Sequence, residues 1–337
     1  MTLRNNASPQ TTVSVSPSST DVVPKTPLLV MAALVCALAL PSLGPSAFYL
    51  HLANLTLLNA IIVMGFALVA SVGQLSLCHA ALAGLGGYVS AVAALRFSVP
   101  PLMGILLAAA VSGLAAALLG TVILRLRGVY FILVTFLVGQ GFTLIALNWD
   151  SVTHGANGMV GIPSISFLGK TFGSRADFYY VALVAFAIVL GGIYALMRST
   201  FGRSFKSIAE NILLAEACGM NTRSLQLLAF AVGSAIAGAG GAMLTHYSRY
   251  ISPDSFTFQE SVLYITMFVI GGRHRLAGAF LGAALLTPLP ELLRNFAGYQ
   301  QIIYGCVLIL VLIFVPNGLT SLPSLLRGRR AAQGGVR

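Results

Sequence analysis

The chain has 337 residues, of which 57% are hydrophobic and only 8% are charged. Soluble domains carry about 25% charged residues, so this composition excludes an ordinary soluble domain and indicates a polytopic membrane protein. The net charge of +11 comes from basic residues that stand singly between apolar runs. No basic patch with interleaved aromatic residues is present, so we expect no nucleic-acid partner.

The two ends of the chain differ in composition from its apolar body. Residues 1–26 are rich in Ser, Thr, Pro and Asn, which predicts a disordered N-terminal tail. Their basic residues are too sparse for a signal peptide, so we expect the apolar run from Pro27 to remain as a membrane anchor. One integral membrane domain is predicted over residues 27–320, followed by a basic cytoplasmic tail over residues 321–337.

The apolar body predicts an all-α fold of about ten transmembrane or partly re-entrant helices. A full crossing of the bilayer needs about 20 apolar residues. We place the segments at 28–43, 51–72, 76–95, 101–124, 128–147, 178–197, 225–246, 258–272, 276–293 and 299–316.

The positions of the basic residues predict how these segments are oriented, because cytoplasmic loops carry an excess of Lys and Arg. With the N-terminus inside, 14 of the 19 basic residues fall on the cytoplasmic side. Both termini are therefore predicted to be cytoplasmic. The five on the other side are Arg96, Lys170, Arg175, Arg249 and Arg294.

Two segments are unusual for plain spans. Ser76–Leu95 is rich in Gly and Ala and contains His79, whereas Phe256–Gly272 is short and contains Gln259 and Glu260. Interrupted segments in the two halves of a transporter often mark a transport site at the interface of an inverted repeat. Because no repeat is visible in the sequence, the inverted repeat is a hypothesis, and close helix packing is the alternative.

The longest connection between spans runs from Asn148 to Asp177 and is predicted to lie outside the cell. A loop of this length in a compact protein is usually functional, so a lid or a docking surface is expected. Its candidate residues are His154, Asn157 and Gly158.

The segment Ser199–Asn221 combines apolar residues at helical spacing with charged residues on the other sides, which predicts an amphipathic helix in the cytoplasm. Such a helix rests on the membrane surface or docks into a partner protein. Docking is favoured because the helix carries only two basic residues beside two glutamates. The candidate docking residues are Arg203, Phe205, Lys206, Ile208, Glu210, Ile212, Glu216 and Gly219.

No nucleotide-binding or catalytic motif stands out. Gly169-Lys170-Thr171 resembles the end of a phosphate-binding loop, but the glycine that the motif requires is Ser164 here. ATP hydrolysis, if it drives the protein, is therefore expected on another subunit. The eight acidic residues form no close pair within a span, which disfavours ion coupling. The four cysteines show no metal-ligand spacing.

A series of motifs resembles the permeases of branched-chain (hydrophobic) amino acid ABC importers, and the M-type subunit most of all. In order along residues 50–320 they are Gly73-Gln-Leu-Ser-Leu-Cys-His-Ala-Ala81, Gly84 to Tyr88, Arg127-Gly-Val-Tyr-Phe131, Val134-Thr135, Thr153-His-Gly-Ala-Asn-Gly158, Gly161-Ile-Pro163, Phe201-Gly-Arg-Ser-Phe-Lys-Ser-Ile-Ala-Glu-Asn211, Ala215-Glu-Ala-Cys-Gly219, Leu227 to Phe230, Gly271-Gly272 and Pro290-Glu-Leu-Leu-Arg294. The departures from the family pattern are Cys78, Gln140, His154 and the run Arg273-His274-Arg275.

The resemblance implies a permease in a bacterial inner (cytoplasmic) membrane, working with a shorter homologous permease, two ATPases and an extracytoplasmic substrate-binding protein. It implies that Ser199–Asn221 is the coupling helix, that ATP and magnesium bind the partner subunits, and that this chain is not an enzyme and binds no cofactor. An ATP-independent channel or carrier for small neutral solutes such as urea or amides is the alternative. The exact substrate is left open.

The polar residues inside apolar segments are the candidates for the translocation pathway. Each could instead make a hydrogen bond between helices. Thr135 and Gln140 lie five residues apart on one predicted helix, so they should point in different directions. The candidates are Gln74, Ser76, His79, Thr135 and Gln140, with Asn59 as a weaker one.

Overall fold

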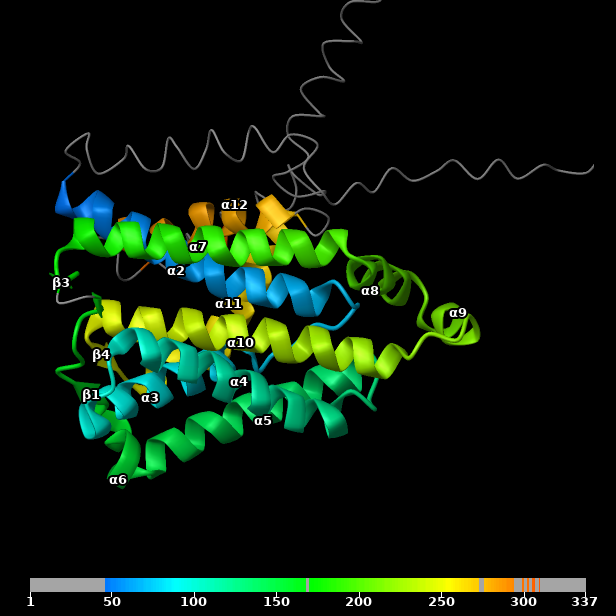
Figure 1. Ribbon diagram of the computed structural model, residues 1–337, viewed down its shortest axis with the longest axis horizontal. Helices are drawn as coiled ribbons and strands as arrows, with labels where there is room; N and C mark the ends of the chain where they lie inside the picture. The colour runs from blue at the N-terminus through cyan, green and yellow to red at the C-terminus, as the bar shows by residue number, and fades with distance from the viewer. Residues whose placement is uncertain are drawn as a thin grey trace, which may run out of the picture.

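The computed structural model describes residues 46–167, 170–272 and 276–293, together with 299, 302, 305, 306 and 309 (Figure 1). The predicted span at 28–43 and both predicted tails lie outside the described residues, as does most of the predicted span at 299–316. Six helices are long and apolar enough to cross a membrane: α2 (Ala47–Ala70), α3 (His79–Phe97), α4 (Pro101–Ile123), α5 (Val129–Asn148), α7 (Arg175–Arg198) and α10 (Thr222–Ser248).

The remaining elements are short. They are the helices α6 (Asp150–Thr153), α8 (Thr200–Glu210), α9 (Ile212–Ala217), α11 (Phe258–Gly271), α12 (Leu276–Leu286) and α13 (Pro288–Leu292), the 3₁₀ turns η2 (Gly155–Asn157) and η3 (Pro253–Phe256), and the strands β1 (Met159–Val160), β2 (Ser166–Phe167), β3 (Lys170–Thr171) and β4 (Tyr250–Ile251). The all-α prediction is confirmed. With 14 residues, α11 is about 21 Å long, less than the thickness of a bilayer core.

The core is built around the pair α2 and α10. Gly65 and Gly233 lie against each other where the helices meet, and a side chain on either would collide with the backbone of the other. Gly240, which comes later in α10, packs on Ile61 and Ile62, which come earlier in α2, so the two helices are antiparallel. Small residues at such a crossing let two backbones approach closely.

The helices around this pair form an inverted arrangement. In the first half, α3 and α4 pack on each other and on α10; in the second half, α11 and α12 pack on each other and on α2. Because α2 and α10 run in opposite directions, the pair α11 and α12 is oriented upside down relative to the pair α3 and α4. This is the arrangement that an inverted repeat produces, in agreement with the hypothesis drawn from the interrupted segments.

Both halves contain a helix that begins inside the bundle. After α2 ends, residues 71–78 turn back between the helices and α3 begins at His79, whose side chain is bonded to the Ile62 carbonyl. After α10 ends, residues 250–257 turn back from the opposite end and α11 begins at Phe258. The two interruptions expected in 76–95 and 256–272 are thus both present.

The two ends of the bundle carry different structures (Figure 1). Helices α8 and α9 lie at one end, beyond the last turn of α7. The described loop residues 149–167 and 170–174 and the strands lie at the other end, where β1 pairs antiparallel with β4 and β2 with β3. The loop and the amphipathic segment therefore face opposite sides of the membrane, as their assignment to opposite compartments requires.

The amphipathic segment corrects one prediction. Ser199–Asn221 is not a single helix but two, because Asn211 has an extended backbone (φ −155°, ψ 103°) between α8 and α9. The Asn211 side chain accepts a hydrogen bond from the Leu214 amide at 3.1 Å and so caps the second helix. Helical periodicity continues on both sides of such a break, which is why the pattern concealed it.

Candidate functional site

The candidate site lies where the first turns of α3 and α11 meet inside the bundle. The backbone N–H of Ala80 donates to Oγ of Ser261 at 3.1 Å, which joins the N-terminal turn of α3 to that of α11. The first four N–H groups of a helix have no partner within it, so helix starts are the places where a buried backbone can bind polar groups. In this arrangement two such starts from the two repeats face each other.

His79 is completely buried at the first position of α3. Its Nε2 lies 3.0 Å from the carbonyl oxygen of Ile62, and because a carbonyl only accepts, Nε2 carries the proton. Nδ1 is then an acceptor, and it has no hydrogen-bond partner among the described residues. The ring stands edge-on to Phe66 at 5.4 Å, so an apolar wall fixes its orientation.

The residues before His79 are held from the side by α5. Oγ of Thr135 accepts a hydrogen bond from the backbone N–H of Leu77 at 3.1 Å, and Ser76 and Cys78 form a buried contact at 3.2 Å between Oγ and Sγ. Gln74 is also buried. The structure therefore brings three of the pathway candidates, Ser76, His79 and Thr135, to the start of α3, and Gln74 is buried in the same segment before it.

Gln140 lies on a different face of α5 and is exposed, in agreement with the prediction that Thr135 and Gln140 point in different directions. Asn59, the weaker candidate, donates through Nδ2 to Oγ1 of Thr287 at 3.1 Å and so joins α2 to the segment between α12 and α13. That contact fits the alternative reading of an interhelical hydrogen bond.

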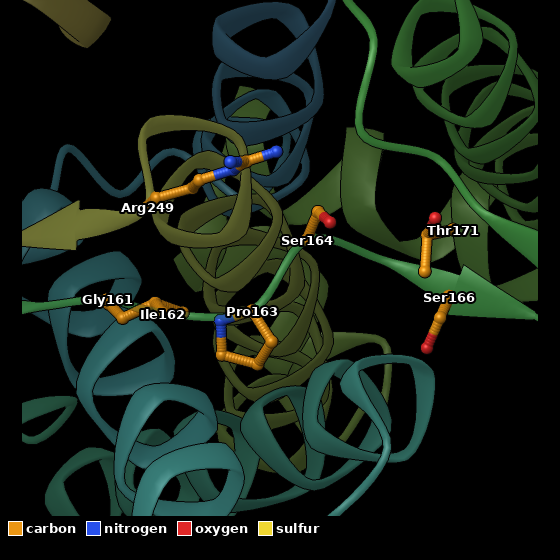
Figure 2. A pocket seen from close by; sticks show the side chains of 7 residues that line it. All are labelled: Gly161, Ile162, Pro163, Ser164, Ser166, Thr171 and Arg249. Carbon is orange, nitrogen blue, oxygen red and sulfur yellow. The ribbon is translucent and has the colours of Figure 1, made fainter.

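A pocket lies at the opposite end from α8 and α9. Figure 2 shows Ser166 and Thr171 on neighbouring strands and the side chain of Arg249 extending away above Ser164. The described residues leave a space of about 390 Å³ here, and it is open to the surface. Its lining residues are Gly161, Ile162, Pro163, Ser164, Ser166, Thr171 and Arg249.

A chain of hydrogen bonds connects this pocket to the helices. The carbonyl of Pro163 accepts from Nδ1 of His246 at 2.7 Å, so Nε2 of the same ring accepts from the Ser90 hydroxyl at 2.8 Å. Ser90 and His246 are both buried, in α3 and α10. These hydrogen bonds connect the pocket wall at Pro163 to the interrupted helix α3.

The loop that carries the pocket is folded onto the bundle, with Met159, Ile162 and Ile165 buried. His154 has φ of 60°, a conformation that favours glycine, and the family resemblance places Gly at this position. Gly158 also has positive φ, and a side chain there would collide with the Ile251 carbonyl. Asn157 and His154 are exposed, so they are available at this surface.

At the other end, the burial of α8 corrects the expected docking face. Phe205 and Ile208 are 0% and 3% exposed because they pack against the chain's own bundle. They are therefore not available to a partner, and they instead fix α8 beneath α7 and α10. The large apolar residues left exposed on α8 and α9 are Phe201, Leu213 and Leu214.

Among the other docking candidates of this segment, too, some contact the chain itself and others are exposed. Oε1 of Glu216 lies 2.9 Å from the Arg127 guanidinium and accepts from the Thr222 hydroxyl at 3.0 Å, so this carboxylate ties α9 to the turn before α5. Arg203 and Glu210 are exposed, Lys206 and Ile212 are half-buried, and Gly219 has φ of 79° at the end of α9.

Comparison with known proteins adds to this geometry. The family described as branched-chain amino acid transport system, permease component, matches residues 48–316. The chain belongs to this family.

Three relatives illustrate the relationship of this permease to its family. The high-affinity branched-chain amino acid transport system permease protein LivM of Salmonella typhimurium is 30% identical over 88% of this chain and 75% of its own. LivM of Escherichia coli is 30% identical over 92% and 79%. LivH of Salmonella typhimurium, a permease protein of the same named system, is 27% identical over 57% and 65%. No solved structure matches the permease.

Several residues that build the site of the permease escaped the sequence analysis. Ser261 and the pair Ser90–His246 act across 156 to 181 positions of sequence, so no local pattern marks them. Leu213 and Leu214 were overlooked because the helical pattern assigned the apolar face to Phe205 and Ile208. The sequence does contain one signal for a second helix: Asn211 is a favourable N-cap residue and stands directly before a new apolar run.

Proposed function

We propose that this chain is the M-type membrane subunit of an ATP-driven importer that passes branched-chain or other small hydrophobic amino acids. The proposal extends the family membership, and the relatives' names supply the substrate class. A shorter homologous permease, two ATPases bound to ATP and magnesium, and an extracytoplasmic binding protein complete the importer. The chain itself then needs no nucleotide site.

The observation that carries the proposal is the form of α8 and α9. Leu213 and Leu214 are 64% and 62% exposed on a helix outside the bundle, while Phe205 anchors the preceding helix to the membrane domain. Two adjacent exposed leucines on a fixed helix are suited to insertion into an apolar groove of a partner. A channel without a partner has no use for this pair.

The orientation follows from the same assignment. If α8 and α9 meet the ATPases, that end of the bundle is cytoplasmic, and we propose that both termini lie on the cytoplasmic side of a bacterial inner membrane. The pocket beside Arg249 then faces the binding protein. His154 and Asn157 are exposed at the same end, which supports their place in that docking surface.

The test is a paired substitution, Leu213→Asp with Leu214→Asp, in the tagged chain expressed with its genomic neighbours. We expect the variant to reach the membrane with its homologous permease but to lose the ATPases on purification in mild detergent, because two charges cannot enter an apolar groove. The matched control is Ser207→Asp, which adds a charge on the exposed part of α8 and should retain the ATPases.

Retention of the ATPases by the paired variant would show that they do not dock on α9. Purification of the wild-type chain alone, as a homo-oligomer that passes solute in liposomes without ATP, would replace the importer by the channel.

A further inference from the structure

Two neighbouring helices, α5 and α11, each carry an exposed glutamine close to the point where they touch. The rings of Phe136 in α5 and Phe258 in α11 pack edge-to-face with centroids 4.9 Å apart, which joins the two helices. Gln140 follows Phe136 by one helical turn and Gln259 follows Phe258 directly, and both glutamines are exposed. We name Gln140 and Gln259 the amide pair.

The amide pair lies at mid-membrane depth. Gln140 is the twelfth residue of α5, which places it about 17 Å along a helix that rises 1.5 Å per residue. Gln259 lies in the first turn of α11, which is bonded to Ala80 at the start of α3. The neighbouring His79 is bonded to Ile62, and Ile62 precedes the end of α2 by eight residues. These eight residues correspond to about 12 Å, so both amides lie well inside a hydrocarbon core about 30 Å thick.

The neighbours of Gln140 on the open side of α5 are apolar. Leu133, Leu137 and Leu144 are 53%, 63% and 59% exposed, which is the composition of a lipid-facing surface. A carboxamide has two N–H groups and a carbonyl that must be desolvated in lipid, at a cost of several kcal/mol without partners. No hydrogen bond is recorded for the side chain of Gln140 or Gln259 within the described residues.

On the other side of α5, Gly139 packs on the backbone of Leu77 and Cys78, and Thr135 is bonded to Leu77. One helix therefore separates the interrupted start of α3 from the sector that holds the amide pair. A movement of α5 would therefore displace both the start of α3 and the amide pair. A helix that only faces lipid needs no such connection to the interrupted helix.

We propose that the amide pair lines a water-filled passage for a zwitterionic amino acid, on the sector where α5 and α11 lie open. This inference rests on the proposed importer function. Each carboxamide can donate to the carboxylate of a passing amino acid and accept from its ammonium group. Because the amides are neutral, such contacts are weak enough to permit release, as passage through a permease requires.

The test is labelling of single cysteines in native membranes that hold the assembled complex. The four native cysteines are first replaced by serine, and Gln140→Cys and Gln259→Cys are compared with Leu107→Cys and Leu114→Cys, at two exposed leucines in the middle of another helix, α4. The probe is a small, permanently charged thiol reagent, which reacts with thiolate and therefore only where water is present. We expect the two glutamine positions to label at least about tenfold faster than the two leucine positions.

Two results would overturn the proposal. Equally slow labelling at all four positions, before and after solubilisation, would place the amide pair in lipid or in a dry contact. Labelling of Gln140→Cys only after the partner permease is stripped away would make the sector a subunit contact. A transport assay supplies the independent readout: Gln140→Leu should lower uptake at least about tenfold while co-purification is unchanged, and Gln140→Asn should restore part of it.

The failure of the importer function is distinguishable from the failure of this inference. If the wild-type chain brings down no ATPase, the importer is wrong. If it brings down the ATPases and transports amino acids, but the amide pair does not label, then only the location of the passage is wrong.

Discussion

The two interrupted helices, α3 and α11, occupy equivalent places in the inverted repeat but are held differently. The start of α3 is buried, with Ser76, Cys78 and His79 at 0% exposure. It is bonded to α2 through the Ile62 carbonyl and to α11 through Ser261, and α5 holds the residue Leu77 just before it.

The segment before α11 is held mainly by packing: β4 pairs with β1, and the buried Phe256 packs against Gly84 of α3. Ser255 N–H donates to the Ser252 carbonyl at 3.1 Å, and the Ser261 N–H donates to the Thr257 carbonyl at 3.3 Å. Its first turn leaves Gln259 exposed, and its contact with α5 is the aromatic pair Phe136–Phe258. The same topology thus yields one break that hydrogen bonds fix to α2 and α5 and one that is packed against its neighbours but leaves Gln259 exposed.

A repeat can therefore keep its architecture while its two halves take on different roles. Hydrogen bonds across helices fix α3, so it should contribute more to stability. A helix that borders an open face can be altered with less structural damage. Substitutions in each half test how far these two roles can be separated.

The largest effect is expected from the close backbone contacts that both halves use. In Gly86→Leu, the new side chain collides with the backbone of Gly238 in α10, and backbone cannot move aside as a side chain can. We expect a loss of more than about 3 kcal/mol, which prevents folding. Membrane yield and size-exclusion profiles of the detergent-solubilised chain measure it.

Gly141→Leu is the matched control, since a side chain at Gly141 meets nothing within 4 Å among the described residues. A wild-type profile for Gly86→Leu would mean that α3 and α10 are not in contact as described.

A smaller effect is expected at the anchor of the first break. Thr135→Val removes the acceptor of the partly buried Leu77 N–H; a fully buried donor left unsatisfied costs about 1–3 kcal/mol, so a loss near the lower end of this range is expected. Thr143→Val, whose hydroxyl bonds only the Gly139 carbonyl of its own helix, should change the free energy of unfolding much less. Denaturant titration in detergent compares the two variants, and equal midpoints would contradict the anchoring role of Thr135.

The smallest effect is expected at α9, for which the other half has no counterpart among the described elements. Arg127→Ala breaks the ion pair with Glu216, whose partners are 53% and 39% exposed. Screened surface pairs of this kind contribute at most about 1 kcal/mol, so the melting temperature should fall only slightly and the difference should vanish at high salt. A large shift that persists in high salt would mean that the pair is essential to the fold.

Much of this protein could be predicted from the sequence. The apolar runs place all six long helices to within about four residues at either end, because a bilayer admits only helices of sufficient length and apolar content. The glycine- and alanine-rich segment after Gln74 and the short segment after Phe256 marked both interrupted helices. The spacing of Thr135 and Gln140 correctly placed them on different faces of α5.

Other features were decided by the tertiary structure alone. Periodicity identifies an apolar face but not what covers it, so Phe205 and Ile208 were assigned to a partner although their own bundle buries them. The inverted repeat is a matter of backbone direction, which residue identity hardly records. The meeting of Ala80 with Ser261 joins residues 181 positions apart, and only the folding of both halves around α2 and α10 brings them within a hydrogen bond.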